Sequence, residues 1–128
     1  MKTEIKTSNA PKAIGPYSQA VLAGQFLFAS GQIPIDPATG DLVSGGIEEQ
    51  AHCVFLNIKA ILDEAGLNFT DVVSATVYLS DINDFSTVNH IYSQYFAEGV
   101  LPSRCAFEVA ALPKNARLEI ACIAYEDK

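Results

Sequence analysis

Two stretches of this chain are apolar at every position of a strand-like run, and this limits the folds that can bury them. Residues 26–29 and 120–124 carry only apolar side chains. Because successive side chains of a strand point to opposite faces, each stretch places apolar groups on both faces of a sheet. Both faces therefore need a cover, from helices, from loops or from another chain.

The spacing of apolar residues predicts two amphipathic helices. In the first, between Ile47 and Ala65, apolar positions recur at intervals of three and four, and Gly66 follows as a helix stop. These positions are Ala51, Val54, Phe55, Ile58, Ile61, Leu62 and Ala65. The second helix begins near Asp84, a favourable N-cap. Its apolar side is formed by Phe85, Val88, Tyr92, Tyr95 and Phe96.

Strand signals lie between and around these helices. Residues 19–22 and 26–30 flank a turn at Gly24, which predicts a hairpin, and residues 37–40 form a second turn. Residues 72–80 form a further strand. The side chains expected to share one face of that strand are Val73, Ala75, Val77 and Leu79. This order of elements predicts an α+β fold with both helices on one face of a sheet.

Two helices leave the other face of such a sheet uncovered. That face, with Tyr78, Ala121 and Ile123, would form an apolar patch larger than a monomer usually exposes. Self-association as a closed cyclic oligomer is the simplest way to bury it. The alternative is a long loop folded over the face, although connections this short rarely cover a sheet.

Length, charge and cysteine content restrict the class of protein. A chain of 128 residues can bury a core without disulfides or metal, so we expect a single domain over residues 1–128. The net charge of -7 disfavours nucleic acid binding, which depends on clustered Lys and Arg. There is no apolar leader or membrane-length apolar run, and the three cysteines have no CxxC spacing. We therefore expect a cytoplasmic protein with no membrane or nucleic acid partner.

One arginine and one glutamate interrupt apolar strands near the end of the sequence. Arg104 opens one strand-like stretch, and Glu119 lies in residues 118–124. Buried ions are rare unless they are paired or serve a ligand. A hairpin turning at residues 112–113 would place Ala121 opposite Arg104. Glu119 would then be the diagonal neighbour of Arg104 on the same face, roughly 7 to 8 Å away.

Strand parity predicts that Arg104 and Glu119 lie on the face away from the helices, at or beside a subunit interface. A small molecule could then bind between the cation and the carboxylate. The alternative is a structural ion pair at the rim of the sheet.

Other catalytic devices are disfavoured. His52 and Cys53 are adjacent, whereas shared metal ligation on a helix needs a spacing of three or four; His90 has no partner at such a spacing, so we expect no metal site. No glycine-rich nucleotide motif is present, and Ser30 lacks both a GxSxG context and a histidine base. Cys105 could act as a nucleophile beside a cation, but strand alternation turns its side chain away from the arginine's face.

Several ordered motifs resemble one protein family. They are Asn9-Ala10-Pro11, Ile14-Gly15-Pro16-Tyr17-Ser18-Gln19-Ala20, Ser30-Gly31-Gln32-Ile33-Pro34, Ser103-Arg104, and Leu112-Pro113 with Glu119-Ile120. Together they resemble the reactive-intermediate imine deaminases, also called RidA, YjgF-like or L-PSP proteins. The resemblance implies a chorismate-mutase-like α+β fold with a mixed, mainly antiparallel sheet, assembled as a homotrimer with clefts between subunits. It also implies hydrolysis of 2-imino acids, such as 2-iminobutanoate and 2-iminopropanoate, to 2-keto acids and ammonia without a cofactor.

The resemblance further implies roles for individual residues. Arg104 is similar to the arginine that binds the substrate carboxylate, a group that a planar guanidinium matches with two parallel hydrogen bonds. Glu119 is similar to the acid that activates water, and one carboxyl that accepts and then donates a proton could serve both steps of imine hydrolysis. The substrate-binding positions implied around the cleft are Tyr17, Ser30, Gly31 and Asn89. Ordinary structural roles are the alternative for these four residues.

Two features depart from the family pattern. Many members have a cysteine two places after the arginine, where this chain has Ala106. Cys105 lies one place early and on the other strand face, so thiol regulation is not expected here. The loop at residues 98–102 is short for the group, which alters the rim of the implied cleft.

Two other functions stay open at this point. The same cleft could bind small carboxylates such as 2-ketobutyrate as a sensor or carrier, without turnover. Endoribonuclease or translation-inhibitor activity is attributed to some relatives, but the acidic charge and the lack of a histidine pair disfavour it.

Overall fold

The computed structural model describes residues 1–127; Lys128, the last residue of the expected domain, lies outside the described residues. Within this range six strands form one sheet in the order β1-β2-β3-β6-β4-β5. The strands are β1 (Lys2–Ile5), β2 (Ala20–Ala23), β3 (Phe26–Gln32), β4 (Val72–Leu79), β5 (Ser103–Glu108) and β6 (Leu118–Tyr125). The helices are α1 (Ile47–Glu64) and α2 (Phe85–Tyr95), with short 3₁₀ turns η1 (Phe69–Asp71), η2 (Ile82–Asp84) and η3 (Pro113–Asn115).

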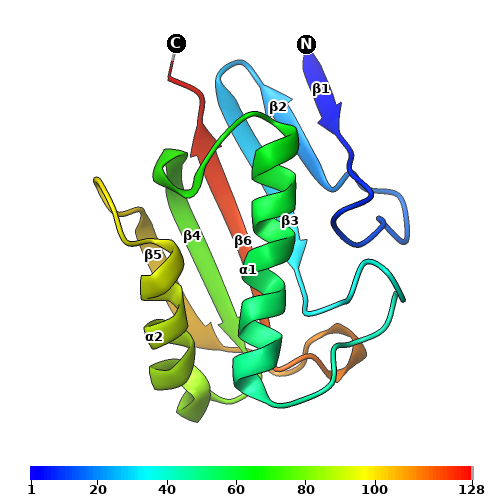
Figure 1. The fold of residues 1–128 in the computed structure, drawn as a ribbon, viewed down its shortest axis with the longest axis vertical. Helices are drawn as coiled ribbons and strands as arrows, with labels where there is room; N and C mark the ends of the chain where they lie inside the picture. The colour runs from blue at the N-terminus through cyan, green and yellow to red at the C-terminus, as the bar shows by residue number, and fades with distance from the viewer. Residues whose placement is uncertain (128) are drawn as a thin grey trace.

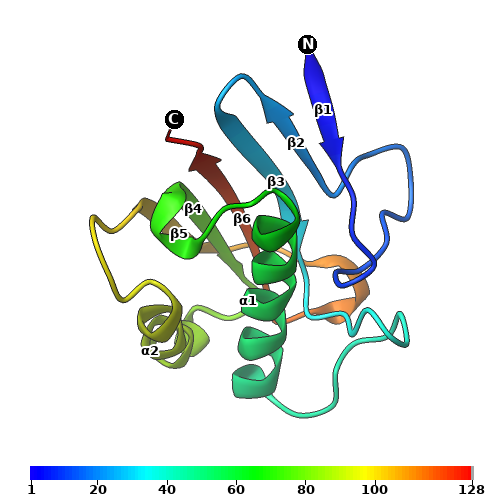
Figure 2. The same ribbon diagram turned by 45° about the horizontal axis from the view of Figure 1, so that its top comes forward.

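Both α-helices lie on the same face of the sheet. Figure 1 shows α1 crossing in front of the central strands, with α2 beside it, and the turned view of Figure 2 keeps both helices on that side. Neighbouring strands are antiparallel except β4 and β5, which run parallel. The predicted α+β architecture, with two helices on one face of a mixed, mainly antiparallel sheet, is confirmed.

Helix α1 forms where the apolar spacing predicts it. The side chain of Glu49 accepts a hydrogen bond from the backbone N–H of Gly46 at 2.7 Å, which satisfies a donor at the start of the helix. The helix ends at Glu64, and Gly66 follows with a φ of 74°, a left-handed conformation that favours glycine. Its buried side chains pack on the sheet and are Gln50, Ala51, Val54, Phe55, Asn57, Ile58, Ile61 and Leu62.

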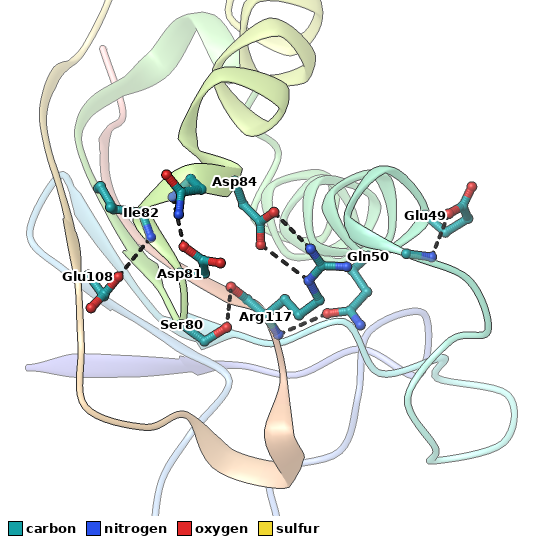
Figure 3. A network of polar contacts seen from close by, with 10 residues as sticks. Glu49, Gln50, Ser80, Asp81, Ile82, Asp84, Glu108 and Arg117 are labelled. Atoms are coloured by element: carbon teal, nitrogen blue, oxygen red, sulfur yellow. Dashed lines mark hydrogen bonds and ion pairs between the residues drawn. The ribbon is translucent and has the colours of Figure 1, made fainter.

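Helix α2 begins after Asp84, as predicted, but the carboxylate of Asp84 does not cap the helix. It accepts hydrogen bonds from Nη2 and Nε of Arg117 at 2.8 and 3.2 Å (Figure 3). The side chain of Gln50 accepts a bond from the backbone N–H of Arg117 at 2.9 Å. Arg117, just before β6, therefore ties the start of α2 to α1 and to the centre of the sheet.

The predicted face of the 72–80 strand is wrong at one position. Val73 is 43% exposed, whereas Val72 is 2% exposed and faces the core. The register of β4 against β6 shifts between Val72 and Ser74, and such a bulge moves the side chains on either side of it out of simple alternation. The remaining predicted positions do face the helices: Ala75, Val77 and Leu79.

The hairpin predicted between residues 104–109 and 118–124 does not form. Strand β6 lies in the centre of the sheet between β3 and β4, while β5 pairs with the outer edge of β4. Every second residue of β6 is buried, which fits a position between two other strands. Strand β5 is mostly exposed, which fits a position at the edge of the sheet. The connection contains η3, where Lys114 and Asn115 have φ values of 57° and 58°. The opposite edge strand, β1, has no counterpart among the predicted elements.

The face of the sheet away from the helices is uncovered in the single chain, as expected. Phe28 and Phe107 on this face are 47% and 43% exposed, so no described loop covers it. We call this surface the open face and define it by Phe26, Phe28, Tyr78, Phe107, Ala121 and Ile123. Its aromatic rings pack on one another, with Tyr78 and Phe107 in an edge-on contact at 5.4 Å between centroids. Its exposed aromatic side chains fit burial against another chain.

Candidate functional site

Arg104 lies at the start of β5 and is held against α2. Its strand register aligns it with Ala75, a buried residue of β4 that faces the helices. Its Nη1 donates a hydrogen bond to Oδ1 of Asn89 at 2.6 Å. Its guanidinium carbon lies 5.3 Å from the ring centre of Phe85 and 4.7 Å from that of Tyr92. The side chain is therefore held in place although it is exposed in the single chain.

One expectation about Arg104 is wrong. It lies on the helix side of the sheet rather than opposite the helices. This error follows from the hairpin that does not form. Because β5 pairs with β4 and not with β6, Ala121 is aligned with Thr76, and Glu119 is not a diagonal neighbour of Arg104.

Glu119 lies on the open face, half-buried on β6 and aligned with Tyr78. Its side chain lies over Gly31 of β3, so closely that a Cβ at position 31 would overlap the carboxyl group. Burial raises the pKa of Glu119 above its ordinary value of 4.5. A carboxyl group with a raised pKa keeps its proton nearer to neutral pH, which suits proton donation as well as acceptance.

Ser30 and Tyr17 lie near the glycine that Glu119 covers. The hydroxyl of Ser30 donates to the carbonyl of Ser18 at 2.7 Å, so its proton is used within the fold. The hydroxyl of Tyr17 accepts a hydrogen bond from the backbone N–H of Ile14 at 3.3 Å, and the residue is 53% exposed. Tyr17 and Gly31 line one pocket of about 440 Å³. The hydroxyl group of Ser30 is therefore engaged in a hydrogen bond within the chain, while the side chain of Tyr17 is exposed and could contact a ligand.

The chain thus carries two separate groups of candidate residues. Arg104 and Asn89 are together on the helix side, and Glu119 lies over Gly31 on the open face. The first group presents a cation that can bind a carboxylate, and the second a carboxyl group able to exchange a proton. The sheet lies between these two groups within one copy of the chain.

Sequence reasoning missed two residues of the arginine's surroundings. Phe85 and Tyr92 were predicted only as apolar residues of the second helix, yet both rings contact the guanidinium. The available signal was their spacing: Phe85, Asn89 and Tyr92 occur at i, i+4 and i+7 and therefore share one side of a helix.

The thiols differ in exposure. Cys105 is exposed and is aligned with Thr76, on the face opposite to that of Arg104, as strand alternation predicts. Burial raises the pKa of Cys122 to about 12, and that of Cys53 is also raised by burial. The two thiols with a raised pKa are poor nucleophiles, because the thiolate is the reactive form.

Among the described residues, histidine and acidic groups do not assemble into a cluster suited to a metal. Within residues 1–127, no three His, Cys, Asp or Glu side chains are grouped so that they could hold a metal ion. His52 instead shares a hydrogen bond of 2.8 Å between its Nδ1 and the hydroxyl of Tyr95. Among the described helices, none has the length and apolar character to cross a membrane.

Comparison with known proteins shows which family the chain resembles. A family model described as Endoribonuclease L-PSP matches residues 7–126. The chain is 56% identical over 122 residues to the 2-iminobutanoate/2-iminopropanoate deaminase of Bos taurus, covering 95% of this chain and 88% of that protein. It is 55% identical over 127 residues to a RutC family protein of Pyrococcus horikoshii, covering 99% of this chain and 100% of that protein.

A solved structure agrees with this relationship. The crystal structure of E. coli TdcF with bound serine matches with a TM-score of 0.93 and 43% identity, covering 98% of this chain and 99% of that one. The sequence motifs, the family model and the fold all agree. The chain belongs to the L-PSP family, whose members are also called RidA or YjgF-like proteins.

Proposed function

We propose that this protein is a 2-iminobutanoate/2-iminopropanoate deaminase, which hydrolyses 2-imino acids to 2-keto acids and ammonia. The observation that supports the proposal is the positive charge of Arg104, which has no counter-ion among the described residues. Among the described residues the ion pairs join Lys59 to Asp63 and Arg117 to Asp84, and Arg104 takes part in neither. Its hydrogen-bond partner, Asn89, is neutral. A fixed cation without a counter-ion is suited to an anionic ligand.

In the proposed reaction, Arg104 binds the substrate carboxylate and Glu119 handles the protons. Water adds to the carbon of the C=N bond, and a proton reaches the nitrogen. The resulting carbinolamine loses ammonia as the C=O bond forms, which gives the 2-keto acid. Glu119 accepts a proton from the attacking water and passes it to the imine nitrogen. It then accepts the hydroxyl proton of the carbinolamine and donates it to the leaving nitrogen, a role supported by the raised pKa of its carboxyl group.

The proposed site lies between two copies of the chain in a homotrimer. Arg104 from one copy and Glu119 from the next would face the same substrate, with Tyr17 and Gly31 beside Glu119. The uncovered apolar surface of the open face supports such an assembly. The solution mass should then be near three times 13.7 kDa.

A coupled assay with freshly generated 2-iminobutanoate tests the function directly. Arg104→Ala should lower kcat/KM on the order of 10²-fold, because two charge-assisted hydrogen bonds to the carboxylate are lost. Glu119→Ala should lower kcat by about 10²- to 10⁴-fold with a smaller effect on ligand binding. Lys59→Ala, which removes an exposed cation of α1, serves as the control and should keep the wild-type rate. Wild-type rates in both site variants would show that the residue assignment is wrong.

A second candidate is a binding protein for small carboxylates or amino acids. It is favoured by the relative TdcF, whose crystal structure contains bound serine. Saturable binding of 2-ketobutyrate or serine without faster decay of the imine would support this candidate over the enzyme. Ribonuclease activity, in contrast, is disfavoured by the net charge of -7.

A further inference from the structure

We propose that Phe85, Asn89 and Tyr92 form a cradle on α2 that positions the guanidinium of Arg104 for binding a carboxylate edge-on. The assignment of a carboxylate as the ligand rests on the function proposed above. In this view Asn89 is a positioning residue that acts through Arg104, and the two aromatic rings share that role.

The helix supplies the geometry of the cradle. Residues at i, i+4 and i+7 lie on one side of an α-helix, so Phe85, Asn89 and Tyr92 face β5 together. The guanidinium carbon of Arg104 lies 5.3 and 4.7 Å from the two ring centres, within the range of cation–π contact. Because the rings contact the planar group and Asn89 accepts from Nη1, the side chain is restrained at three points.

The restraint leaves one edge of the guanidinium available. Asn89 accepts from Nη1 of Arg104, and none of the described residues accepts from Nε or Nη2. These two atoms carry parallel N–H groups, the arrangement that a carboxylate matches with two hydrogen bonds. The contacts on α2 therefore select which edge of Arg104 meets the ligand.

The neutrality of Asn89 matters for affinity. An aspartate at this position could reach the same guanidinium nitrogen, but it would neutralise the cation and compete with the ligand for it. The amide oxygen fixes the guanidinium without removing its charge. Asn89→Asp should therefore keep Arg104 immobilised and yet weaken carboxylate binding.

The ring of Tyr92 contributes more than its hydroxyl group. Tyr92 is 7% exposed, and its hydroxyl oxygen has no hydrogen-bond partner among the described residues. Burial raises the pKa of Tyr92, against a smaller opposing effect of Arg104, so the hydroxyl stays protonated. Tyr92→Phe should consequently preserve the position of Arg104, whereas Tyr92→Leu should release it.

The side-chain Nε–H signals in an ¹⁵N NMR spectrum test the cradle without any assay of activity. The sequence contains only two arginines, Arg104 and Arg117, so Arg104→Lys assigns both signals. The Arg104 signal should be shifted by the neighbouring rings and show restricted motion in the wild type. Phe85→Leu and Tyr92→Leu should move it toward the position of a free arginine, with the Arg117 signal unchanged.

Phe96→Leu is the matched control, because Phe96 is 5% exposed and packs against Tyr92 with its ring tilted, whereas the ring contacts of the guanidinium among the described residues are with Phe85 and Tyr92. It should leave the Arg104 signal in place. The proposal would be overturned if the wild-type Arg104 Nε–H signal had the chemical shift of a free arginine. It would also be overturned if that signal did not move in either Phe85→Leu or Tyr92→Leu. An equal change in Phe96→Leu would also overturn it, since the rings would then act only through helix packing.

Titration with 2-oxobutanoate and with its neutral amide connects the cradle to the ligand. Loss of either ring should weaken binding of the acid by about three- to tenfold and leave the amide unaffected. In an Arg104→Ala background, Phe85→Leu should have no further effect on the acid. If the wild type shows no imine hydrolysis while the NMR results are as expected, the proposed function is wrong but the cradle is supported. If the cradle variants bind 2-oxobutanoate as tightly as the wild type does, the positioning role is wrong.

Discussion

Arg104 and Glu119 lie on opposite faces of the same sheet. Arg104 is aligned with the helix-facing residue Ala75, and Glu119 is aligned with Tyr78 on the open face. The sheet therefore lies between the two side chains of one copy. Under the proposed function, each catalytic site therefore combines Arg104 of one copy with Glu119 of another.

Mixing two inactive variants tests this arrangement. Arg104→Ala and Glu119→Gln should each lack activity alone. If they are unfolded together and refolded as mixed trimers, about a quarter of the sites should combine an intact arginine with an intact glutamate and regain turnover. The specific activity of the refolded mixture measures this fraction, with each variant refolded alone as the control. Continued inactivity of well-folded mixed trimers would show that both residues of a site come from one copy.

Gly31→Ala should reduce turnover with little loss of stability. A Cβ at position 31 would overlap the end of the Glu119 side chain, which can rotate away and so leave its working position. We expect kcat on 2-iminobutanoate to fall on the order of 10²-fold, as for loss of a general acid–base group. Gly46→Ala is the control, because its Cβ would meet its nearest neighbour at 3.7 Å, an ordinary contact. Unchanged kcat in Gly31→Ala would contradict the role of Glu119.

The stability of the protein should depend on pH through Glu119. Burial raises the pKa of this carboxyl group, so the folded state holds the proton more tightly than the unfolded state, in which the pKa is near 4.5. The stabilising contribution is then complete below the unfolded pKa and is lost as pH rises through the folded pKa. Glu119→Gln does not ionise, so its stability relative to the wild type should increase as the pH rises above the unfolded pKa of 4.5 and through the raised folded pKa. Urea denaturation across this range measures the difference, which a purely steric effect would leave constant.

Asp84→Ala should destabilise the fold more than loss of a surface ion pair. Asp84 holds two nitrogens of Arg117 and is 9% exposed (Figure 3). Because the Arg117 side chain is 41% exposed, we expect a loss of about 1–2 kcal/mol in the free energy of unfolding rather than the full cost of a buried pair. Asp63→Ala, which breaks the exposed pair with Lys59, should cost less than about 0.5 kcal/mol. Equal losses in the two variants would show that the Asp84 contact carries no special weight.

The local elements of the fold could be predicted from the sequence, but the pairing of β5 and β6 could not. Helix α1, helix α2 and the hairpin of β2 and β3 each follow from spacing within a short segment. The position of β6 between β3 and β4 depends on contacts with strands far away in the sequence, which periodicity does not record. The bulge at Val72 likewise depends on the partner strand and changed the face of Val73.

The same limit explains the errors about the candidate site. Arg104, Glu119, Gly31 and Asn89 were singled out from the sequence, and the structure brings them together in the two pairs Arg104–Asn89 and Glu119–Gly31. The side of the sheet that Arg104 faces was wrong, because its parity was inferred through the absent hairpin. Its contact with Tyr92 required knowing that α2 packs beside β5, which is a tertiary relationship.

The central place of β6 has a consequence for synthesis in the cell. When β1 to β5 have emerged from the ribosome, β3 and β4 each still lack the neighbour that β6 provides. Until residue 125 is free, a nascent chain exposes two unpaired apolar strand edges, which favour mispairing with other chains. The sheet therefore closes only after translation of β6. Before that point, molecular chaperones that bind the exposed edges of β3 and β4 would prevent mispairing.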